Sequence, residues 1–168
     1  MLTREKISNL FEQLNAALKE RDVIGEVGIC GGAVMCLVFQ ARESTKDVDG
    51  IFAPTKEIRE AAIQIAHDLR LPEDWLNDAA KGFFMSPPPE VDVMNLSNLR
   101  VWAPSAPYML AMKCVSARFD SHDADDVQFL IEHLKLNRPD QVFDLIEKFY
   151  PHEQIPAKAR FLVEELLS

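Results

Sequence analysis

Cysteine is scarce in this chain of 168 residues, and its spacing suits neither a disulfide framework nor a metal site. The three cysteines are Cys30, Cys36 and Cys114. An odd number without a CxxC pair argues against a disulfide-stapled fold and against a structural zinc site. Free cysteines are most often buried as small apolar side chains. We therefore expect all three to serve as packing residues.

Long hydrophobic runs are missing as well. No apolar segment approaches the roughly 20 residues that a membrane-spanning helix needs. The N-terminal stretch is amphipathic and reads MLTREKISNLFEQL, without an apolar core followed by a small-residue cleavage site. These absences predict a cytoplasmic protein that has no association with the membrane.

Basic residues are outnumbered, with 18 Lys and Arg against 27 Asp and Glu and a formal net charge of −9. Such an acidic chain is a poor broad binder of DNA, because the phosphate backbone is captured mainly by positive charge. A small basic groove remains compatible with this charge. Its candidate members are Lys81, Arg100, Lys113 and Arg118.

The remaining composition, 48% hydrophobic and 27% charged, is typical of a soluble globular protein. The length favours one domain spanning 1–168. Strand and helix patterns mix in the first part of the chain, and helical patterns dominate after about residue 105. We therefore predict an α/β or α+β fold, with a small mixed sheet flanked by helices and a helical C-terminal layer.

Hydrophobic periodicity places most elements. Residues 3–20 form an amphipathic helix that Thr3 caps, and a second helix begins at Thr55, which is also assigned as a cap. Short strands are expected near 27–29, 47–52, 91–93 and 99–102. The apolar run 33–39 fits a buried strand or a buried helix, and the glycine pair before it favours the helix. Further helices are expected near 108–118, 124–136, 139–149 and 156–167.

Two aspartates carry the strongest chemical signal. Asp47 and Asp49 are two residues apart on a predicted strand, so their side chains share one face. Adjacent carboxylates repel unless a cation lies between them, and Mg²⁺ prefers carboxylate and phosphate oxygens. Asp92, between two valines on a strand expected to lie beside the first, would complete a two-metal site. The alternatives are a solvated strand edge for the pair, and a buried base or a turn donor as the partner of Asp92.

A glycine pair precedes these aspartates. Gly31 and Gly32 let the main chain approach a ligand, and a helix that starts there presents free N–H groups to an anion. A triphosphate bound there and bridged by Mg²⁺ to Asp47 and Asp49 is a coherent arrangement. Two metal ions about 3.5–4 Å apart would stabilise the attacking and leaving oxygens of an in-line displacement. The plainer interpretation of the glycine pair is a simple turn.

The segment that joins the two features reads CGGAVMCLVFQARESTKDVDGIF. It resembles the signature of the DNA polymerase β-like nucleotidyltransferase superfamily, in which a glycine pair and a helix precede Asp-x-Asp on a strand. The stretch from Arg42 to Asp49 resembles the Arg-x-Ser-Thr-x-Asp-Ile/Val-Asp form of the minimal bacterial branch. That branch includes the AbiEii-type toxins of abortive-infection and toxin–antitoxin systems.

A later stretch, 103–130, resembles the downstream helix pair of the same family. There a Lys is followed by an Arg and by Asp-x-x-Asp, and the matching residues are Lys113, Arg118, Asp123 and Asp126. Two plainer interpretations stay open. The acids suit a helix start, where the macrodipole favours them, and the lysine suits an apolar surface from which its ammonium reaches water.

The resemblance covers about 25–130, and it implies a nucleotidyltransferase fold with C-terminal helices over about 137–168. The implied metal-binding and catalytic residues are Asp47, Asp49 and Asp92, of which Asp92 also helps to deprotonate the attacking hydroxyl. The implied nucleotide-binding residues are Gly31, Gly32, Arg42, Ser44 and Lys113. Arg42 and Ser44 are equally compatible with a polar loop. Mg²⁺ or Mn²⁺ is the implied cofactor, and an NTP the implied substrate.

The expected function is therefore Mg²⁺-dependent transfer of a nucleotidyl group from an NTP to a hydroxyl acceptor. An RNA 3′ end is one such acceptor, in a toxin-like setting with an antitoxin protein as partner. The alternative is a module of the same fold that binds a nucleotide or a protein without turnover. A third hypothesis is a modifier of small molecules. The small, acidic chain lacks an added nucleic-acid-binding domain, which argues against a long nucleic-acid substrate.

Overall fold

The structure of this protein, a computed structural model, describes residues 1–116, 121–151 and 153–168. These residues form two units. The first, here called the sheet unit, comprises Met1–Lys81 and Glu90–Pro104, and the second, the helical unit, comprises Gly82–Pro89 and Ser105–Ser168. The boundary between them falls inside the range 25–130, which the family resemblance treats as one core.

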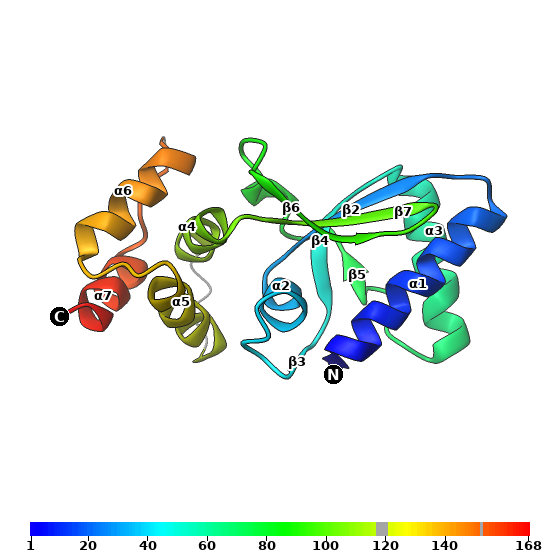
Figure 1. The fold of residues 1–168 in the computed structure, drawn as a ribbon, viewed down its shortest axis with the longest axis horizontal. Coiled ribbons are helices and arrows are strands. Elements are labelled where there is room, and N and C mark those ends of the chain that lie inside the picture. Colours follow the sequence, from blue (N-terminus) through cyan, green and yellow to red (C-terminus); the bar gives the residue numbers. More distant parts are fainter. Residues whose placement is uncertain (117–120, 152) are drawn as a thin grey trace. The chain divides into compact units, whose positions relative to one another are not determined.

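A five-stranded sheet forms the centre of the sheet unit in the described part of the chain (Figure 1). The strands lie in the order β5-β4-β2-β7-β6. Their bounds are Gly25–Cys30 for β2, Val48–Ala53 for β4, Leu76–Asn77 for β5, Glu90–Asn95 for β6 and Leu99–Pro104 for β7. β2 pairs antiparallel with β4 and parallel with β7, while β6 pairs antiparallel with β7. The predicted small mixed sheet flanked by helices, and with it the α+β class, is confirmed.

A second, two-stranded sheet involves the first residues of the chain. β1 (Leu2–Thr3) pairs antiparallel with β3 (Ser44–Thr45), so that Leu2 lies opposite Thr45. The loop that leads to Asp47 is therefore fastened to the N-terminal segment. Figure 1 shows β3 and the short helix α2 (Gly32–Leu37) close to the N-terminal end of the chain.

Two helices of the sheet unit pack against the same apolar face of the sheet. Gly25 in β2 lies against α1 (Arg4–Glu20) and α3 (Thr55–Leu69), because a Cβ there would come within 2.9 Å of Ile58 and 3.1 Å of Leu18. Val27 and Ile29 point to the same side as Gly25 and are fully buried. This face of the sheet therefore forms the core of the unit with α1 and α3.

The opposite face of the sheet carries the polar residues of interest. Glu26, Gly28 and Cys30 point to this face; Glu26 is exposed, Gly28 and Cys30 are buried, and Asp49 lies directly opposite Cys30. We call this surface the Asp49 face. It is the side of the sheet on which Asp49 lies, and with it the candidate site.

The helix boundaries follow the sequence pattern, with one exception. The hydroxyl of Thr3 accepts a hydrogen bond from the Lys6 N–H at 3.2 Å, which confirms the predicted cap. The run after the glycine pair is the buried helix α2, not a strand. The assignment of Thr55 as a cap is wrong. Pro54 occupies the capping position, and the Thr55 hydroxyl instead donates to the Phe52 carbonyl at 3.1 Å.

The helical unit contains the four predicted C-terminal helices. They are α4 (Ala106–Ser116), α5 (Ser121–His133), α6 (Pro139–Phe149) and α7 (Ala157–Leu166). The segment Gly82–Pro89 belongs to this unit as well, and the Tyr108 hydroxyl donates to the Ser86 carbonyl at 3.0 Å. Within the described ranges, no helix has both the length and the apolar character needed to cross a membrane.

Candidate functional site

The glycine turn after β2 brings the first two site residues together. Gly31 has a φ of 63° and a ψ of −141°, a conformation that glycine adopts far more readily than other residues. A Cβ on Gly31 would lie 3.7 Å from the Asp49 Oδ2 atom. The turn and one aspartate of the pair are therefore neighbours at the end of β2.

Gly32 is a glycine for a different reason. A Cβ at this position would lie 2.5 Å from the Thr45 Oγ1 atom and 3.0 Å from the Arg42 Nη1 atom. The space over Gly32 is thus occupied by side chains of the protein itself. The sequence argument assigned this space to an incoming ligand, and the structure shows that Thr45 and Arg42 take part of it.

The two aspartates differ in how the main chain holds them. Asp49 lies within β4 and faces Cys30 in the ladder, whereas Asp47 precedes the first residue of the strand. Burial raises the pKa of the half-buried Asp47 carboxyl; Lys46 lowers it, and the negative charge of Asp74 raises it further. The pKa of Asp47 therefore depends in part on the charge of Asp74. Asp49 lies beside the glycine turn.

Arg42 and Ser44 flank the same turn. The Arg42 guanidinium lies over Gly32, as its distance to the missing Cβ shows, and Ser44 is a half-buried residue of β3 opposite Thr3. Both residues were assigned to phosphate contacts from the family resemblance. The structure places Arg42 where it can meet an anion at the turn. It places Ser44 in the two-stranded sheet next to Thr45.

Asp92 lies elsewhere on the Asp49 face. It is in the edge strand β6, and the strands β7 and β2 both lie between β6 and β4. At about 4.8 Å per strand, three spacings separate Asp92 from Asp49 by roughly 14 Å. The expectation that Asp92 comes from a strand beside that of Asp49 is therefore wrong. A single metal ion does not span this separation.

An arginine holds Asp92 in its position. The Arg100 Nε and Nη2 atoms lie 3.2 Å and 2.9 Å from the Asp92 Oδ1 atom, and Nη1 lies 2.7 Å from Glu26 and 2.9 Å from Glu90. The hydrogen bonds that Arg100 donates to Glu26, Asp92 and Glu90 raise its pKa. The partner of Asp92 is thus a base, but it is not a buried one, since the side chains of Arg100 and Asp92 are 36% and 59% exposed. Arg100 contributes no free positive charge to a basic groove.

Lys113 also has carboxylate partners. Its Nζ atom lies 2.8 Å from the Asp123 Oδ1 atom and 2.7 Å from the Asp126 Oδ2 atom. Lys113 and Asp126 are both buried, so this triad joins α4 to α5 inside the helical unit. The ammonium neither reaches water nor is free for a phosphate. Arg118, the remaining basic residue of the resemblance, lies outside the described residues.

The donor set fits one kind of metal site only. Among the residues that the structure describes, no group of three or more His, Cys, Asp or Glu side chains is arranged to hold a metal ion. Mg²⁺ usually binds through one or two carboxylates together with water and substrate phosphates. Asp47 and Asp49 can supply those carboxylates only if the phosphates complete the coordination. A preformed protein cage is not present in this part of the chain.

Two residues near the site were not identified from the sequence. Thr45 touches Gly32 and donates from its hydroxyl to the Asp47 carbonyl at 3.3 Å. Asp74 acts on Asp47 from the segment before β5. The place of Thr45 two residues before Asp47 could have indicated a local contact between the two residues. Nothing local in the sequence marks Asp74, because its approach depends on the pairing of β5 with β4.

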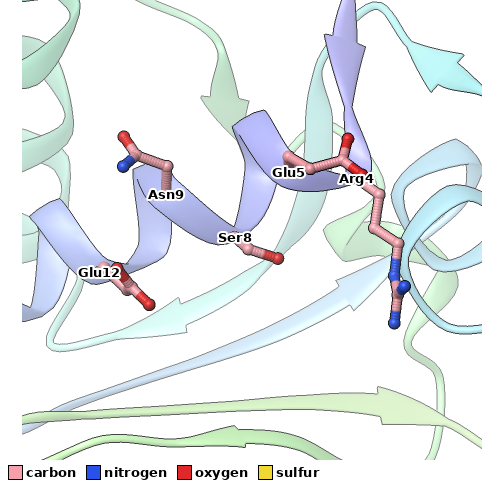
Figure 2. Close-up of a pocket in the computed structure, with 5 residues that line it drawn as sticks. All are labelled: Arg4, Glu5, Ser8, Asn9 and Glu12. Atoms are coloured by element: carbon pink, nitrogen blue, oxygen red, sulfur yellow. The ribbon is translucent and has the colours of Figure 1, made fainter.

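A groove of about 360 Å³ lies along α1. Figure 2 shows its lining side chains on α1, and they are Arg4, Glu5, Ser8, Asn9 and Glu12. One of its amide oxygens is already used, since Asn9 accepts a hydrogen bond from Gln13 at 2.6 Å. The groove has mixed charge and contains none of the glycine-turn residues.

We also compared the chain with known proteins. No family model, no curated protein and no solved structure matches it.

Proposed function

We propose that this protein binds the triphosphate of an NTP at the glycine turn and transfers its nucleotidyl group to a hydroxyl acceptor. One observation carries the proposal. The Asp49 carboxylate, the Arg42 guanidinium and the positive-φ turn at Gly31 meet at one end of β2 and β4. The carboxylate can bind a metal ion, the guanidinium can bind a phosphate, and the turn lets the main chain come close to the ligand. A metal–triphosphate complex uses all three kinds of contact.

Each residue has a defined part in this proposal. Arg42 contacts a phosphate through its guanidinium, which suits bidentate recognition of phosphate oxygens. Asp47 and Asp49 hold Mg²⁺ or Mn²⁺ together with the phosphate oxygens. The metal ion, when bound, neutralises charge that develops on the transferred phosphate. Asp92 and Lys113 take no part in binding, because both are held in ion pairs of their own.

A second function is favoured by a specific observation, the place of Asp92. Without a third carboxylate beside Asp49, the site lacks the residue that the family resemblance assigns to activation of the hydroxyl. The place of Asp92, taken by itself, favours a nucleotide-binding module without turnover as the second candidate function. The net charge of −9 suits a basic protein as the partner of such a module.

Thermal unfolding with each of the four NTPs, with and without Mg²⁺, tests the binding step. A ligand at about 100 times its dissociation constant adds roughly 2.7 kcal/mol of stability, a shift of several degrees for a chain of this size. We expect a Mg²⁺-dependent shift in the native protein that Asp49→Asn and Arg42→Gln remove. Asp68→Asn, an exposed aspartate on α3, is the matched control and should keep the shift.

The outcomes separate the two functions. A shift that persists in Asp49→Asn would contradict the assigned site. A shift that is lost, together with transfer of labelled nucleotide to an RNA or protein acceptor, supports the enzyme. The same shift without transfer to any acceptor supports the binding module.

A further inference from the structure

Thr45, in the short strand β3, is unusual because it is a buried polar side chain. It is 6% exposed, and in the described part of the chain only Lys113 and Asp126 are also buried and polar or charged. Those two residues pair with each other in the helical unit. A buried hydroxyl is costly unless it is hydrogen-bonded. The burial of Thr45 therefore points to a specific contact.

Thr45 contacts both halves of the site. Its Oγ1 atom donates to the Asp47 carbonyl at 3.3 Å. The same Oγ1 atom and the Thr45 Cβ lie 2.5 Å and 3.3 Å from where a Cβ of Gly32 would be. One side chain thus bridges the glycine turn and the loop that carries the first aspartate.

Asp47 needs such a contact because the sheet does not hold it. Asp49 is fixed by the ladder between β4 and β2, in which it faces Cys30. The ladder contact with β5 begins at Val48, whose N–H donates to the Trp75 carbonyl at 2.6 Å. Asp47 lies between this anchor and Thr45. The hydrogen bond from Thr45 is therefore the constraint on the preceding side.

We propose that Thr45 is a positioning residue of this site, which sets the place of the Asp47 carboxylate relative to the glycine turn. Its hydroxyl holds the Asp47 carbonyl, and its side chain fills the space over Gly32. The pairing of Thr45 with Leu2 anchors this bridge to the N-terminal strand β1. Thr45 does not touch the nucleotide. The inference rests on the proposed function, since it assumes that Asp47 binds the metal–nucleotide complex.

Two substitutions separate the hydroxyl from the shape of the side chain. Thr45→Val keeps the shape and loses the hydroxyl, while Thr45→Ser keeps the hydroxyl. Thr55→Val is the control, because the exposed Thr55 also donates to a main-chain carbonyl, at 3.1 Å, away from the glycine turn. Each variant is examined by thermal unfolding and by the affinity for the NTP that shifts the native protein most, with and without Mg²⁺. The chemical shifts of the Asp47 carbonyl carbon and the Gly32 amide are measured without nucleotide.

We expect Thr45→Val to weaken the Mg²⁺-dependent affinity about tenfold, which is the effect of one hydrogen bond. Thr45→Ser should restore most of this affinity, and Thr55→Val should lose stability without losing affinity. The two chemical shifts should move in Thr45→Val and stay in Thr55→Val. A metal-dependent affinity that falls equally in both valine variants would overturn the inference.

The inference and the proposed function fail in different ways. If the native protein binds no NTP, the proposed function fails, and the chemical shifts alone decide whether Thr45 positions Asp47. If NTP binding is present but neither the affinity nor the shifts respond to Thr45→Val, the function stands and the positioning role is wrong.

Discussion

The glycine turn of the sheet unit and the α4–α5 pair of the helical unit both gather charged residues, but they do so in opposite ways. At the turn, Asp47 and Asp49 are half-buried. Between α4 and α5, Lys113 and Asp126 are buried against each other. At the turn, burial disfavours the ionised form of Asp47 and so raises its pKa. The α4–α5 pair satisfies its charges internally.

The comparison shows why charged motifs alone are poor guides to a site. Lys113 and the Asp-x-x-Asp acids resemble a second, less specific part of the family pattern, yet they meet one another. Burial of an ion pair that is fully hydrogen-bonded serves packing between two helices. The half-buried Asp49 instead lies beside the glycine turn, 3.7 Å from where a Cβ of Gly31 would be. Substitutions in the two units can test this difference between the glycine turn and the α4–α5 pair.

The largest effect is expected in the helical unit. Lys113→Met leaves the buried Asp126 without its cation and should lower the free energy of unfolding by about 3–5 kcal/mol. Adding Asp126→Leu should restore part of the loss. Urea denaturation followed by circular dichroism measures both, with the exposed Lys148→Met as control. If Lys113→Met instead leaves the stability unchanged and abolishes NTP binding, Lys113 belongs to the binding site, and the difference drawn between the two units is wrong.

Glycine replacement compares the two units directly. Gly31→Ala forces a side chain into a glycine conformation, and we expect a loss of about 1–3 kcal/mol in the free energy of unfolding. Gly82→Ala, in the segment of the helical unit, meets no atom within 4 Å of the new Cβ. It should be neutral or stabilising by up to about 1 kcal/mol. Equal effects of the two changes would show that the turn at Gly31 is not constrained.

Replacing the distant aspartate tests the sheet topology. Asp92→Asn should change the Mg²⁺-dependent NTP affinity by less than about twofold, because sites separated by more than 7–10 Å act nearly independently. Isothermal titration with the preferred NTP measures this, beside Asp49→Asn as the inactive reference. If both variants lose binding to the same extent, the strand order must bring the two carboxylates closer than three spacings allow.

The smallest effect concerns pH. The folded state raises the pKa of Asp47 above its ordinary value of 3.8, so the folded protein holds this proton more tightly than the unfolded chain. Stability from this group is therefore full below pH 3.8 and is lost as the pH rises through the raised value. Asp47→Asn should raise the melting temperature at neutral pH in metal-free buffer. The gain should fade on acidification.

Melting curves of the two proteins across this pH range, without Mg²⁺, provide the measurement. Asp68→Asn serves again as a surface control, with no pH-dependent gain expected. A constant difference between Asp47→Asn and the native protein at every pH would mean that charge at Asp47 is not the cause.

Local patterns in the sequence were enough for most of the secondary structure and for half of the site. The apolar stripe and Thr3 define α1, and the run around Asp49 defines β4. The glycine pair and the Asp-x-Asp motif are both short-range features of the sequence. They come together at the end of β2 because β4, the next strand of the same sheet along the chain, pairs antiparallel with β2. Thr55 shows the limit of local rules, since the residue before it takes the capping position.

Long-range pairing decided the remainder. Whether Asp92 reaches Asp49 depends on the order of strands in the sheet, and β7 and β2 come between them. The approach of Asp74 to Asp47 depends on β5, and the partners of Lys113 depend on how α5 follows α4. Side-chain alternation and helix periodicity are properties of neighbouring residues, so the sequence alone determined them. Strand order and the partners of buried charges are properties of the packed chain, and only the tertiary structure decided them.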